Sequence, residues 1–410
     1  MIKGLVLAGG FPQIELINKL HARGVYVLLA DYNKEPVARH YADEYFQVST
    51  LDIEAVKKVA IENEVDFLIT VCTDQALNTV AYVSEELGLP CYINYHTGLN
   101  VTNKVFMKKI FLENAIPTAR YQIMNEFDIE IIKELQYPLI VKPVDCNSSK
   151  GVKRIDSPDE LNAAFMDAIC YSRTKTVLIE EFMEGRELSV DIYVEDGKVN
   201  ILCITQIDKI ASKDKFIIFR GVYPAEISTD IIEQIWQTAQ KVANAFALKN
   251  SPMLMQVITD GNKIRVLEFS ARTGGGVKYL QIKKVTGFDV IDAVIDLTMG
   301  KKPHYEKRNT EIKYLMNEFI YCKEGVFDRL AGFDELINKD LISDYYLFKS
   351  RGTKFGEINS SGDRVAGFTI LAENKAELIK KHNKVAGSIR ILDKDGIDIM
   401  HHELLAKLEI

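Results

Sequence analysis

One short stretch of this 410-residue chain, Arg265 to Gly276, combines a carboxylate, a guanidinium and three consecutive glycines. Alternation along the apolar strand at its start predicts that Val266, Glu268 and Ser270 share one face. A carboxylate followed by Arg272, at the mouth of a glycine loop, suits a metal-bound phosphate and an anionic intermediate. A hairpin that ends in a stabilising ion pair explains the same residues, so this stretch alone leaves both interpretations open.

The strand before this stretch supplies a second oxygen donor. Residues 253–259 and 263–269 are predicted to form a hairpin around the turn Asp260-Gly-Asn262. Gln256 and Glu268 are then expected to lie opposite each other across the hairpin, where both side chains reach one ion.

Upstream, Lys142 ends the apolar strand of residues 137–143. Burying an ammonium without a partner is expensive, so an anionic ligand is a natural partner for this lysine. The loop that follows offers backbone N–H groups, the hydroxyls of Ser148 and Ser149, and Gly151 for close approach, which are features of a phosphate cover. A surface turn explains the loop equally well but does not explain Lys142.

Two further segments have a chemical and a structural interpretation. The helix predicted over 103–114 carries Lys104, Lys108 and Lys109 on its outward face, and a solvated basic face is the favoured interpretation. The strands of residues 176–194 surround an acidic turn and are able to sandwich an adenine, with backbone groups of Glu181 to Met183 at its edge and Glu187 at the ribose. An ordinary hairpin explains these strands as well.

The elements that position these residues begin with a βαβ unit at the N-terminus. Residues 8–12 read Ala-Gly-Gly-Phe-Pro, which lacks the spaced third glycine of a dinucleotide fingerprint, and Pro12 removes a backbone donor. A structural Rossmann-like domain is therefore favoured over an NAD site, and an NAD-dependent oxidoreductase remains an alternative that rests on residues 7–10 alone.

Bulk properties exclude several classes. The length argues for two or three domains, and the net charge of −7 does not favour nonspecific nucleic-acid binding. The six cysteines form no Cys-x-x-Cys pair, which fits a reducing compartment and argues against zinc or disulfides. Residues 1–10 are too short for a signal or membrane segment. We expect a cytoplasmic enzyme without nucleic-acid or membrane partners.

In this order, the motifs resemble the ATP-grasp superfamily over essentially the whole chain. The resemblance is greatest to the group of biotin carboxylase, glycinamide ribonucleotide synthetase and carbamoyl-phosphate synthetase large subunits. It implies an α/β and α+β fold: a Rossmann-like pre-ATP-grasp domain at 1–101, an ATP-grasp domain at 102–310 with a lid at about 138–190, and a small C-terminal α+β domain at 311–410. The segment 362–368 fits the closing strand of that family.

The resemblance also implies roles for single residues, together with ATP and Mg²⁺, or Mn²⁺, as cofactors. ATP would be bound by Lys104, Lys142, Ser148, Ser149, Gly151, Glu180, Glu181, Phe182, Met183 and Glu187. Glu268 matches the metal ligand that bridges two ions, and Arg272 the arginine near an acyl phosphate. Gln256 and Ser270 stand where an acidic residue and an asparagine are usual. Both keep an oxygen for Mg²⁺, but Gln256 brings no charge.

The implied activity is an ATP-dependent carboxylate–amine or carboxylate–ammonia ligase that works through an acyl phosphate. Arg272 and the N–H groups of Gly274, Gly275 and Gly276 would stabilise the intermediate, and Arg220 is a further candidate for binding a substrate carboxylate. A bicarbonate-activating enzyme is the alternative within the family, and a nucleotide sensor with little turnover is the alternative outside enzymes. A homodimer and a glutaminase partner stay open.

Overall fold

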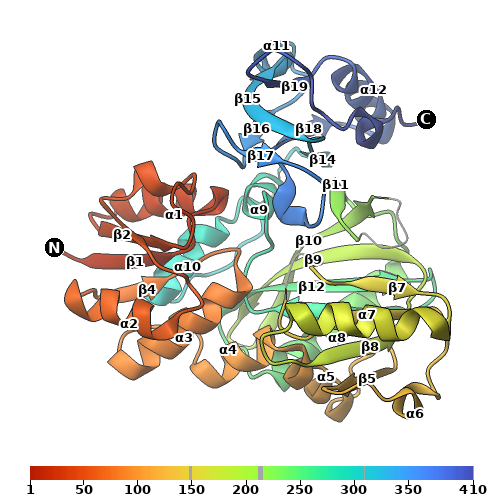
Figure 1. Cartoon of the computed structure of the whole chain (residues 1–410). Coiled ribbons are helices and arrows are strands. Elements are labelled where there is room, and N and C mark those ends of the chain that lie inside the picture. The colour runs from red at the N-terminus through yellow and green to blue at the C-terminus, as the bar shows by residue number, and fades with distance from the viewer. Residues whose placement is uncertain (147–149, 211–215, 309, 410) are drawn as a thin grey trace.

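The computed structural model describes residues 1–146, 150–210, 216–308 and 310–409. Ser148 and Ser149, two of the predicted phosphate-cover residues, lie outside these ranges. Figure 1 shows an N-terminal domain in red, a lid in yellow, a large green sheet and a C-terminal part in blue. The predicted mixture of α/β and α+β architecture is confirmed.

The N-terminal domain is built on a parallel sheet with the strand order β3-β2-β1-β4. Strands β1, β2 and β4 are apolar and largely buried, as expected where helices cover both faces of a sheet, whereas no residue of the edge strand β3 is buried. The elements are β1 (Lys3–Leu7), α1 (Phe11–His21), β2 (Tyr26–Asp31), β3 (Glu44–Gln47), α2 (Ile53–Glu62), β4 (Phe67–Ile69), α3 (Asp74–Leu87) and α4 (Tyr95–Thr102). A single-turn 3-10 helix, η1 (Arg39–Tyr41), precedes β3.

The acidic residue at the end of β2 has a structural task. The two carboxylate oxygens of Asp31 accept hydrogen bonds from the backbone N–H groups of Gly9 and Asn33, each at 2.7 Å. An NAD site would use such a carboxylate for a ribose, whereas here it holds the glycine turn. This geometry supports the structural interpretation of the N-terminal βαβ unit.

The centre of the molecule is an eight-stranded antiparallel sheet with the order β13-β12-β9-β10-β11-β14-β18-β16. Its strands are β9 (Arg186–Glu195), β10 (Lys198–Lys209), β11 (Ile218–Tyr223), β12 (Ser251–Thr259), β13 (Ile264–Ser270), β14 (Tyr314–Ile320), β16 (Asp344–Leu347) and β18 (Ala366–Ala372). The last three come from the region assigned to a separate C-terminal domain. The sheet therefore continues across the boundary proposed at residues 310 and 311.

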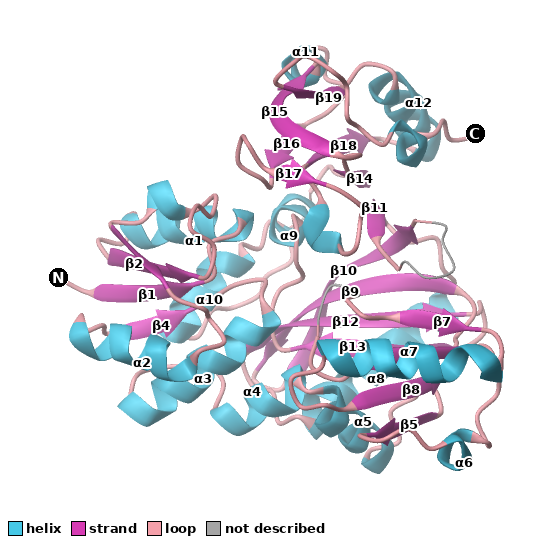
Figure 2. Ribbon diagram, viewed as in Figure 1, coloured by secondary structure: helices cyan, strands magenta, loops and turns pink. Residues whose placement is uncertain are grey.

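The lid is a four-stranded sheet with the order β5-β8-β6-β7, and helix α7 (Pro158–Tyr171) packs across it, as Figure 2 shows. Its strands are β5 (Tyr121–Met124), β6 (Leu139–Pro143), β7 (Lys153–Ile155) and β8 (Val177–Glu181), and the short helix α6 (Ile129–Ile132) lies between the first two. The lid sheet thus begins before the predicted residue 138, and residues 186–190 already belong to the large sheet.

Helices cover the large sheet and complete the molecule. The amphipathic helix α8 (Thr229–Ala245) buries Ile235, Ala239 and Val242 in a core shared with β9, β12 and β13. The remaining elements are α5 (Lys104–Glu113), α9 (Lys278–Thr286), α10 (Val290–Thr298), β15 (Gly325–Ala331), α11 (Phe333–Asn338), β17 (Lys354–Phe355), η2 (Ser361–Asp363), α12 (Lys375–Ala386), β19 (Arg390–Asp393) and η3 (His402–Leu405). Strands β17, β15 and β19 form a small fourth sheet, in the C-terminal part.

One prediction about the central hairpin is wrong. Val266 pairs with Val257, but Glu268 already pairs with Gln256, so the register shifts by one residue at Leu267. Because of this irregularity Val266 is fully buried in the core with Phe269 and does not share the exposed face of Glu268.

Within the described ranges, no helix is long and apolar enough to cross a membrane.

Candidate active site

The hairpin β12–β13 brings together the three predicted metal ligands. Gln256 lies opposite Glu268, as the turn length predicted, and Ser270 follows on the same strand. The Nε2 of Gln256 donates to Glu187 Oε1 at 3.2 Å, which leaves the amide oxygen of Gln256 available. The Glu268 side chain is 42% exposed, and its Oε2 lies 3.5 Å from Lys104 Nζ.

A pocket opens at this end of the hairpin, between the N-terminal domain and the large sheet. Its lining includes residues predicted to bind the metal, the phosphates and the acyl group. The lining residues are Asp74, Val101, Thr102, Lys104, Met107, Leu254, Gln256, Glu268, Phe269, Ser270 and Arg272. The structure therefore places both proposed catalytic residues, Glu268 and Arg272, and all three proposed metal ligands on one cavity.

The donor set suits Mg²⁺ bound together with a nucleotide. It contains one carboxylate, one amide oxygen and one hydroxyl, all of them hard oxygen donors. Mg²⁺ commonly takes one or two carboxylates and completes its shell with substrate phosphates and water. No group of three or more His, Cys, Asp or Glu side chains poised for a metal occurs among the described residues. A metal held here would thus depend on the phosphates.

The lysines of helix α5 differ from the solvated basic face predicted for them. Lys104 is 8% exposed and Lys108 only 1%, whereas Lys109 is exposed and pairs with Glu113 on its own helix. Lys104 Nζ donates to the backbone oxygen of Cys146 at 2.8 Å. The prediction was wrong for Lys104 and Lys108 because this side of the helix packs against the lid and the hairpin.

Lys142, Lys108 and Glu180 form a buried charge cluster. Glu180 Oε1 pairs with Lys142, and its Oε2 lies 2.7 Å from Lys108 Nζ, which also donates to Thr118 Oγ1 at 2.6 Å. Burial alone would raise the pKa of Glu180, but the two ammonium groups lower it to about 2. Burial lowers the pKa of Lys108 despite its carboxylate partner. One carboxylate serves two cations, so the cluster keeps one positive charge.

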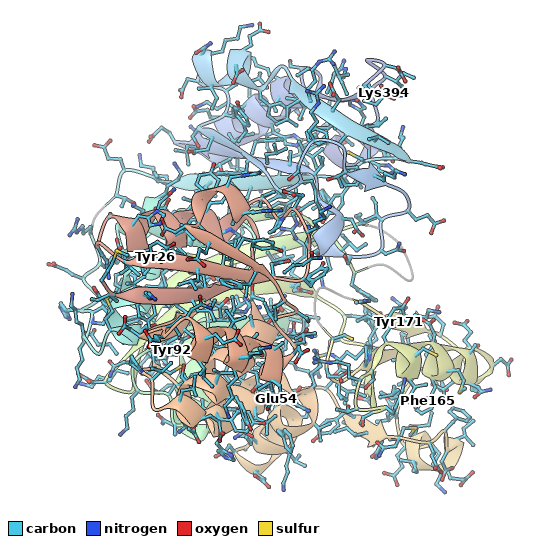
Figure 3. The ribbon with its side chains drawn as sticks, turned by 60° about the vertical axis from the view of Figure 1, so that its left-hand side comes forward. Tyr26, Glu54, Tyr92, Phe165, Tyr171 and Lys394 are labelled. Atoms are coloured by element: carbon cyan, nitrogen blue, oxygen red, sulfur yellow. The ribbon has the colours of Figure 1, made fainter. Side chains whose placement is uncertain are left out.

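The loop after β6 is described only at its ends. Gly151 has φ +71°, and a Cβ there would lie 2.8 Å from the ring of Tyr171 on α7. Figure 3 shows Tyr171 and Phe165 together on this lid helix. Glycine is therefore required at position 151 both for backbone conformation and for space.

The predicted adenine hinge lies at the end of β8. The N–H groups of Glu181 and Phe182 donate to the carbonyls of Arg120 and Pro138, at 3.0 and 2.8 Å. The described residues give the Met183 N–H no partner, so it is the hinge donor that remains for a ligand. The Phe182 ring lies under the Arg154 guanidinium, 4.3 Å from its centroid.

Glu187, the candidate ribose ligand, is buried on β9 and already has two partners. Its Oε2 accepts from Lys209, and its Oε1 accepts from Gln256. The carboxylate thus links the metal hairpin to β10, and a ribose would share it with these groups.

Arg272 is held by a carboxylate of the N-terminal domain. Its Nε donates to Asp74 Oδ1 at 2.6 Å, its Nη2 donates to Asp74 Oδ2, and its Nη1 donates to the Thr273 carbonyl at 2.7 Å. Burial raises the pKa of Asp74, but the guanidinium outweighs it and lowers the pKa below the ordinary range.

The three glycines lie where several parts of the chain meet. A Cβ on Gly274 would lie within about 3 Å of Lys278 and Asp191, which form an ion pair at 3.3 Å. A Cβ on Gly276, where φ is +68°, would lie 2.9 Å from Arg364 Nη1, whereas a Cβ on Gly275 would meet only Cys72 O, at 3.9 Å. Crowding therefore favours glycine at positions 274 and 276 but not at 275.

Arg364 reaches this loop from the C-terminal part. Its guanidinium lies over the ring of Phe319, 4.1 Å from the centroid, and its Nε donates to the carbonyl of Ser361. The described residues give Arg364 no carboxylate partner within ion-pair distance. Burial lowers the pKa of the half-buried Lys349, the charge of Asp363 raises it, and the charge of Arg364 lowers it further. Two cations, Arg364 and Lys349, thus lie near one carboxylate, Asp363.

Arg220 lies apart from the pocket described above. Its guanidinium pairs with Glu318, contacts His382 Nε2 at 3.2 Å and lies 3.6 Å from Asp208. Arg220, Glu318 and His382 are all buried. A substrate carboxylate would compete with these partners, so the candidate role of Arg220 remains a prediction without support from this geometry.

Sequence reasoning missed Asp74, Lys108 and Arg364. Lys108 had a detectable signal, because it follows Lys104 by one helical turn and therefore lies on the same side. Arg364 lies in the segment 362–368, which was matched to the closing strand of the family but given no role. Asp74 had no signal, because it is a single charged residue at a helix start, far in sequence from Arg272.

Comparisons with known proteins agree with this geometry. A family model described as an ATP-grasp domain matches residues 135–280. The formate-dependent phosphoribosylglycinamide formyltransferase of Sulfurisphaera tokodaii is 27% identical over 282 residues, covering 66% of this chain and 70% of that protein. The D-alanine–D-alanine ligase of Flavobacterium johnsoniae is 27% identical over 203 residues, which covers 46% of this chain and 61% of that protein.

Solved structures match over nearly the whole chain. The L-amino acid ligase of Bacillus licheniformis superposes with a TM-score of 0.80 at 18% identity, covering 96% of this chain and 99% of the other. Phosphoribosylglycinamide synthetase of Anaerococcus prevotii superposes with a TM-score of 0.75 at 18% identity, covering 96% and 100%. At such identity these two matches establish a shared fold.

Proposed function

The chain belongs to the ATP-grasp ligases, and from this premise we propose that it joins a carboxylate to an amine through an acyl phosphate. The observation that carries the proposal is the common pocket of Lys104, Glu268 and Arg272. A carboxylate is a poor acyl donor because its oxygen leaves badly. Transfer of the ATP γ-phosphoryl group to it creates a good leaving group.

At the nucleotide end, the residues bind and neutralise phosphates. Lys104 and the cluster of Lys142, Lys108 and Glu180 supply positive charge inside a nearly dry site, where it acts strongly. Glu268, Gln256 and Ser270 would hold Mg²⁺, which neutralises phosphate charge and orients the phosphates when bound. The Met183 N–H is the proposed adenine contact.

At the acyl end, the residues stabilise negative charge. The carboxylate oxygen attacks the γ-phosphorus and ADP leaves; the amine nitrogen then attacks the acyl carbon, loses a proton and expels phosphate. Arg272 and the N–H groups of Gly274 to Gly276 are proposed to stabilise the acyl phosphate and the tetrahedral oxyanion. No nucleophilic side chain of the enzyme is needed for either step.

The substrate class follows from the charge of the acyl end. Arg364, close to Gly276, favours a substrate that carries an anionic group in addition to the reacting carboxylate or amine. The named relatives act on phosphoribosylglycinamide with formate and on D-alanine, so their substrates are small, polar and charged. We propose a small carboxylate such as an amino acid on the same grounds.

A pairwise screen tests the proposal. Purified protein with Mg·ATP is incubated with each pair from a panel of carboxylates, including formate, amino acids and bicarbonate, and amines, including ammonia. ADP and phosphate release that requires both partners supports the ligase. Release with bicarbonate alone would favour the bicarbonate-activating alternative.

Two variants accompany the screen. Glu268→Ala is expected to abolish ADP release, while Arg272→Ala is expected to retain ATP binding and lose amide formation. Full ATP turnover by Glu268→Ala would contradict the metal assignment. ATP binding without turnover under any pairing would favour a sensor.

A further inference from the structure

The N-terminal domain contacts the end of the catalytic hairpin at two neighbouring residues. Tyr92 OH donates to the Ala271 carbonyl at 3.0 Å, and Asp74 holds Arg272. These contacts come from a domain whose described strands are not part of the large sheet. The end of the hairpin is thus held by hydrogen bonds from the N-terminal domain, which does not belong to the same sheet.

The turn that delivers Asp74 has an unusual backbone. Cys72, between β4 and α3, has φ +60°, a conformation that non-glycine residues seldom adopt. Asp74 is the first residue of the 14-residue helix α3, where the N-terminal end of the helix favours a negative charge. Local structure therefore presents an ionised carboxylate toward the pocket in a fixed direction.

The hydrogen bonds define the orientation of Arg272. A guanidinium has five N–H donors in one plane, and a bidentate carboxylate fixes that plane. Asp74 takes two donors and the Thr273 carbonyl takes a third, so one N–H on each terminal nitrogen is not engaged by any described residue. The two side chains are 13% and 15% exposed, which limits the freedom of both.

From these contacts we infer that Asp74 is a positioning residue for Arg272, and this inference rests on the proposed ligase function. Asp74 holds the guanidinium plane so that its two remaining N–H groups meet the acyl phosphate. Asp74 itself need not touch the substrate. Any movement of the N-terminal domain would be transmitted to Arg272 through this pair.

The competing explanation is a structural ion pair between domains, and the chain offers a matched control for it. Arg23, in the turn after α1, pairs with Asp292 and Asp296 on α10, at 3.0 and 2.8 Å. That pair joins the same domain to the rest of the molecule, but its residues do not line the pocket. Asp292→Asn therefore removes the ion pairs of Asp292 with Arg23 and Lys19, leaves Arg23 its pair with Asp296, and does not touch Arg272.

The experiment compares Asp74→Asn, Asp74→Glu and Asp292→Asn in the full chain, using the acid and amine pair found for the wild type. For Asp74→Asn we expect kcat for amide formation to fall about 100-fold, because misplacement of a catalytic group by about 1 Å has that effect. The dissociation constant for ATP is expected to stay within twofold. Asp74→Glu should recover part of kcat, and Asp292→Asn should keep it.

Several outcomes would overturn the inference. The inference is wrong if Asp74→Asn and the wild type have equal kcat. It is also wrong if Asp74→Asn and Asp292→Asn lose kcat equally, because that would indicate a general effect on the domain interface. If Asp74→Asn unfolds, Asp74→Glu decides: no loss of kcat together with wild-type thermal stability contradicts positioning. A wild type without turnover for any pair contradicts the proposed function itself, and so the two failures differ.

Discussion

The two ends of the cleft are built in different ways. At the nucleotide end, Lys104 and Lys108 come from one helix, and Lys142 and Glu180 from neighbouring lid strands. At the acyl end, Asp74, Arg272 and Arg364 come from three parts of the chain. The nucleotide end holds two buried lysines around one carboxylate. At the acyl end Arg272 is paired with Asp74, and Arg364 has no carboxylate partner among the described residues.

The two ends differ in whether their cations are paired with carboxylates of the protein. Glu180 is shared by two lysines inside the protein, so the nucleotide end is stable before ATP arrives. Arg364 lacks a carboxylate partner among the described residues and has its charge available. Mutations at the first end should therefore affect stability and ATP affinity, and those at the second should affect substrate use.

Glu180→Gln should have the largest effect and tests the charge cluster. Removing the shared carboxylate leaves Lys108 and Lys142 without their counter-charge in a buried site, which typically costs about 3–5 kcal/mol. Urea unfolding monitored by circular dichroism measures the change. A loss below about 1 kcal/mol would mean that the cluster does not stabilise the fold, and Glu181→Gln serves as the more exposed control.

The acid dependence of stability tests the same cluster without mutation. Because the pKa of Glu180 is lowered to about 2, its ionised form stabilises the folded state above the unfolded pKa of about 4.3. This contribution should be complete above pH 5 and should be lost as the pH falls from about 4.5 toward 2. The wild type is therefore expected to lose more stability over this window than Glu180→Gln. Parallel curves would contradict the assignment.

Lys108→Met should weaken ATP binding by about tenfold, roughly 1.4 kcal/mol. The substitution leaves Glu180 neutralised by Lys142 alone, so the net positive charge behind the phosphates disappears. Isothermal titration of ATP measures the effect, and Lys109→Met, on the exposed side of the same helix, is the matched control. Equal affinities of the two variants would show that buried charge at position 108 does not act on ATP.

Arg364→Gln should have the smallest effect and tests the acyl end. We expect about a fivefold higher KM for the anionic substrate, with ATP affinity unchanged, because no carboxylate among the described residues pairs with this arginine. Arg351→Gln, an exposed residue paired with Asp328, is the control. A change in ATP affinity with no change in KM would remove the proposed division between the two ends.

The sequence by itself predicted most of the architecture and the nucleotide end. Turn length placed Gln256 opposite Glu268, and an apolar strand ending in Lys142 predicted that this lysine needs a negative partner. Both are local consequences of strand periodicity and of the cost of burying charge. The identity of that partner was not predicted: Glu180 provides it within the protein, in addition to any nucleotide.

Only the tertiary structure decided which lysine face of α5 is buried, because a helix with polar residues on several sides has no preferred face until neighbours pack against it. It also decided the surroundings of Arg272. Asp74 precedes that arginine by 198 residues, and no pattern of spacing encodes their contact. Side-chain periodicity and the cost of burying charge depend on a few neighbouring residues, so they can be recognised from the sequence. The meeting of three separate parts of the chain at the glycines depends on how whole sheets and domains pack.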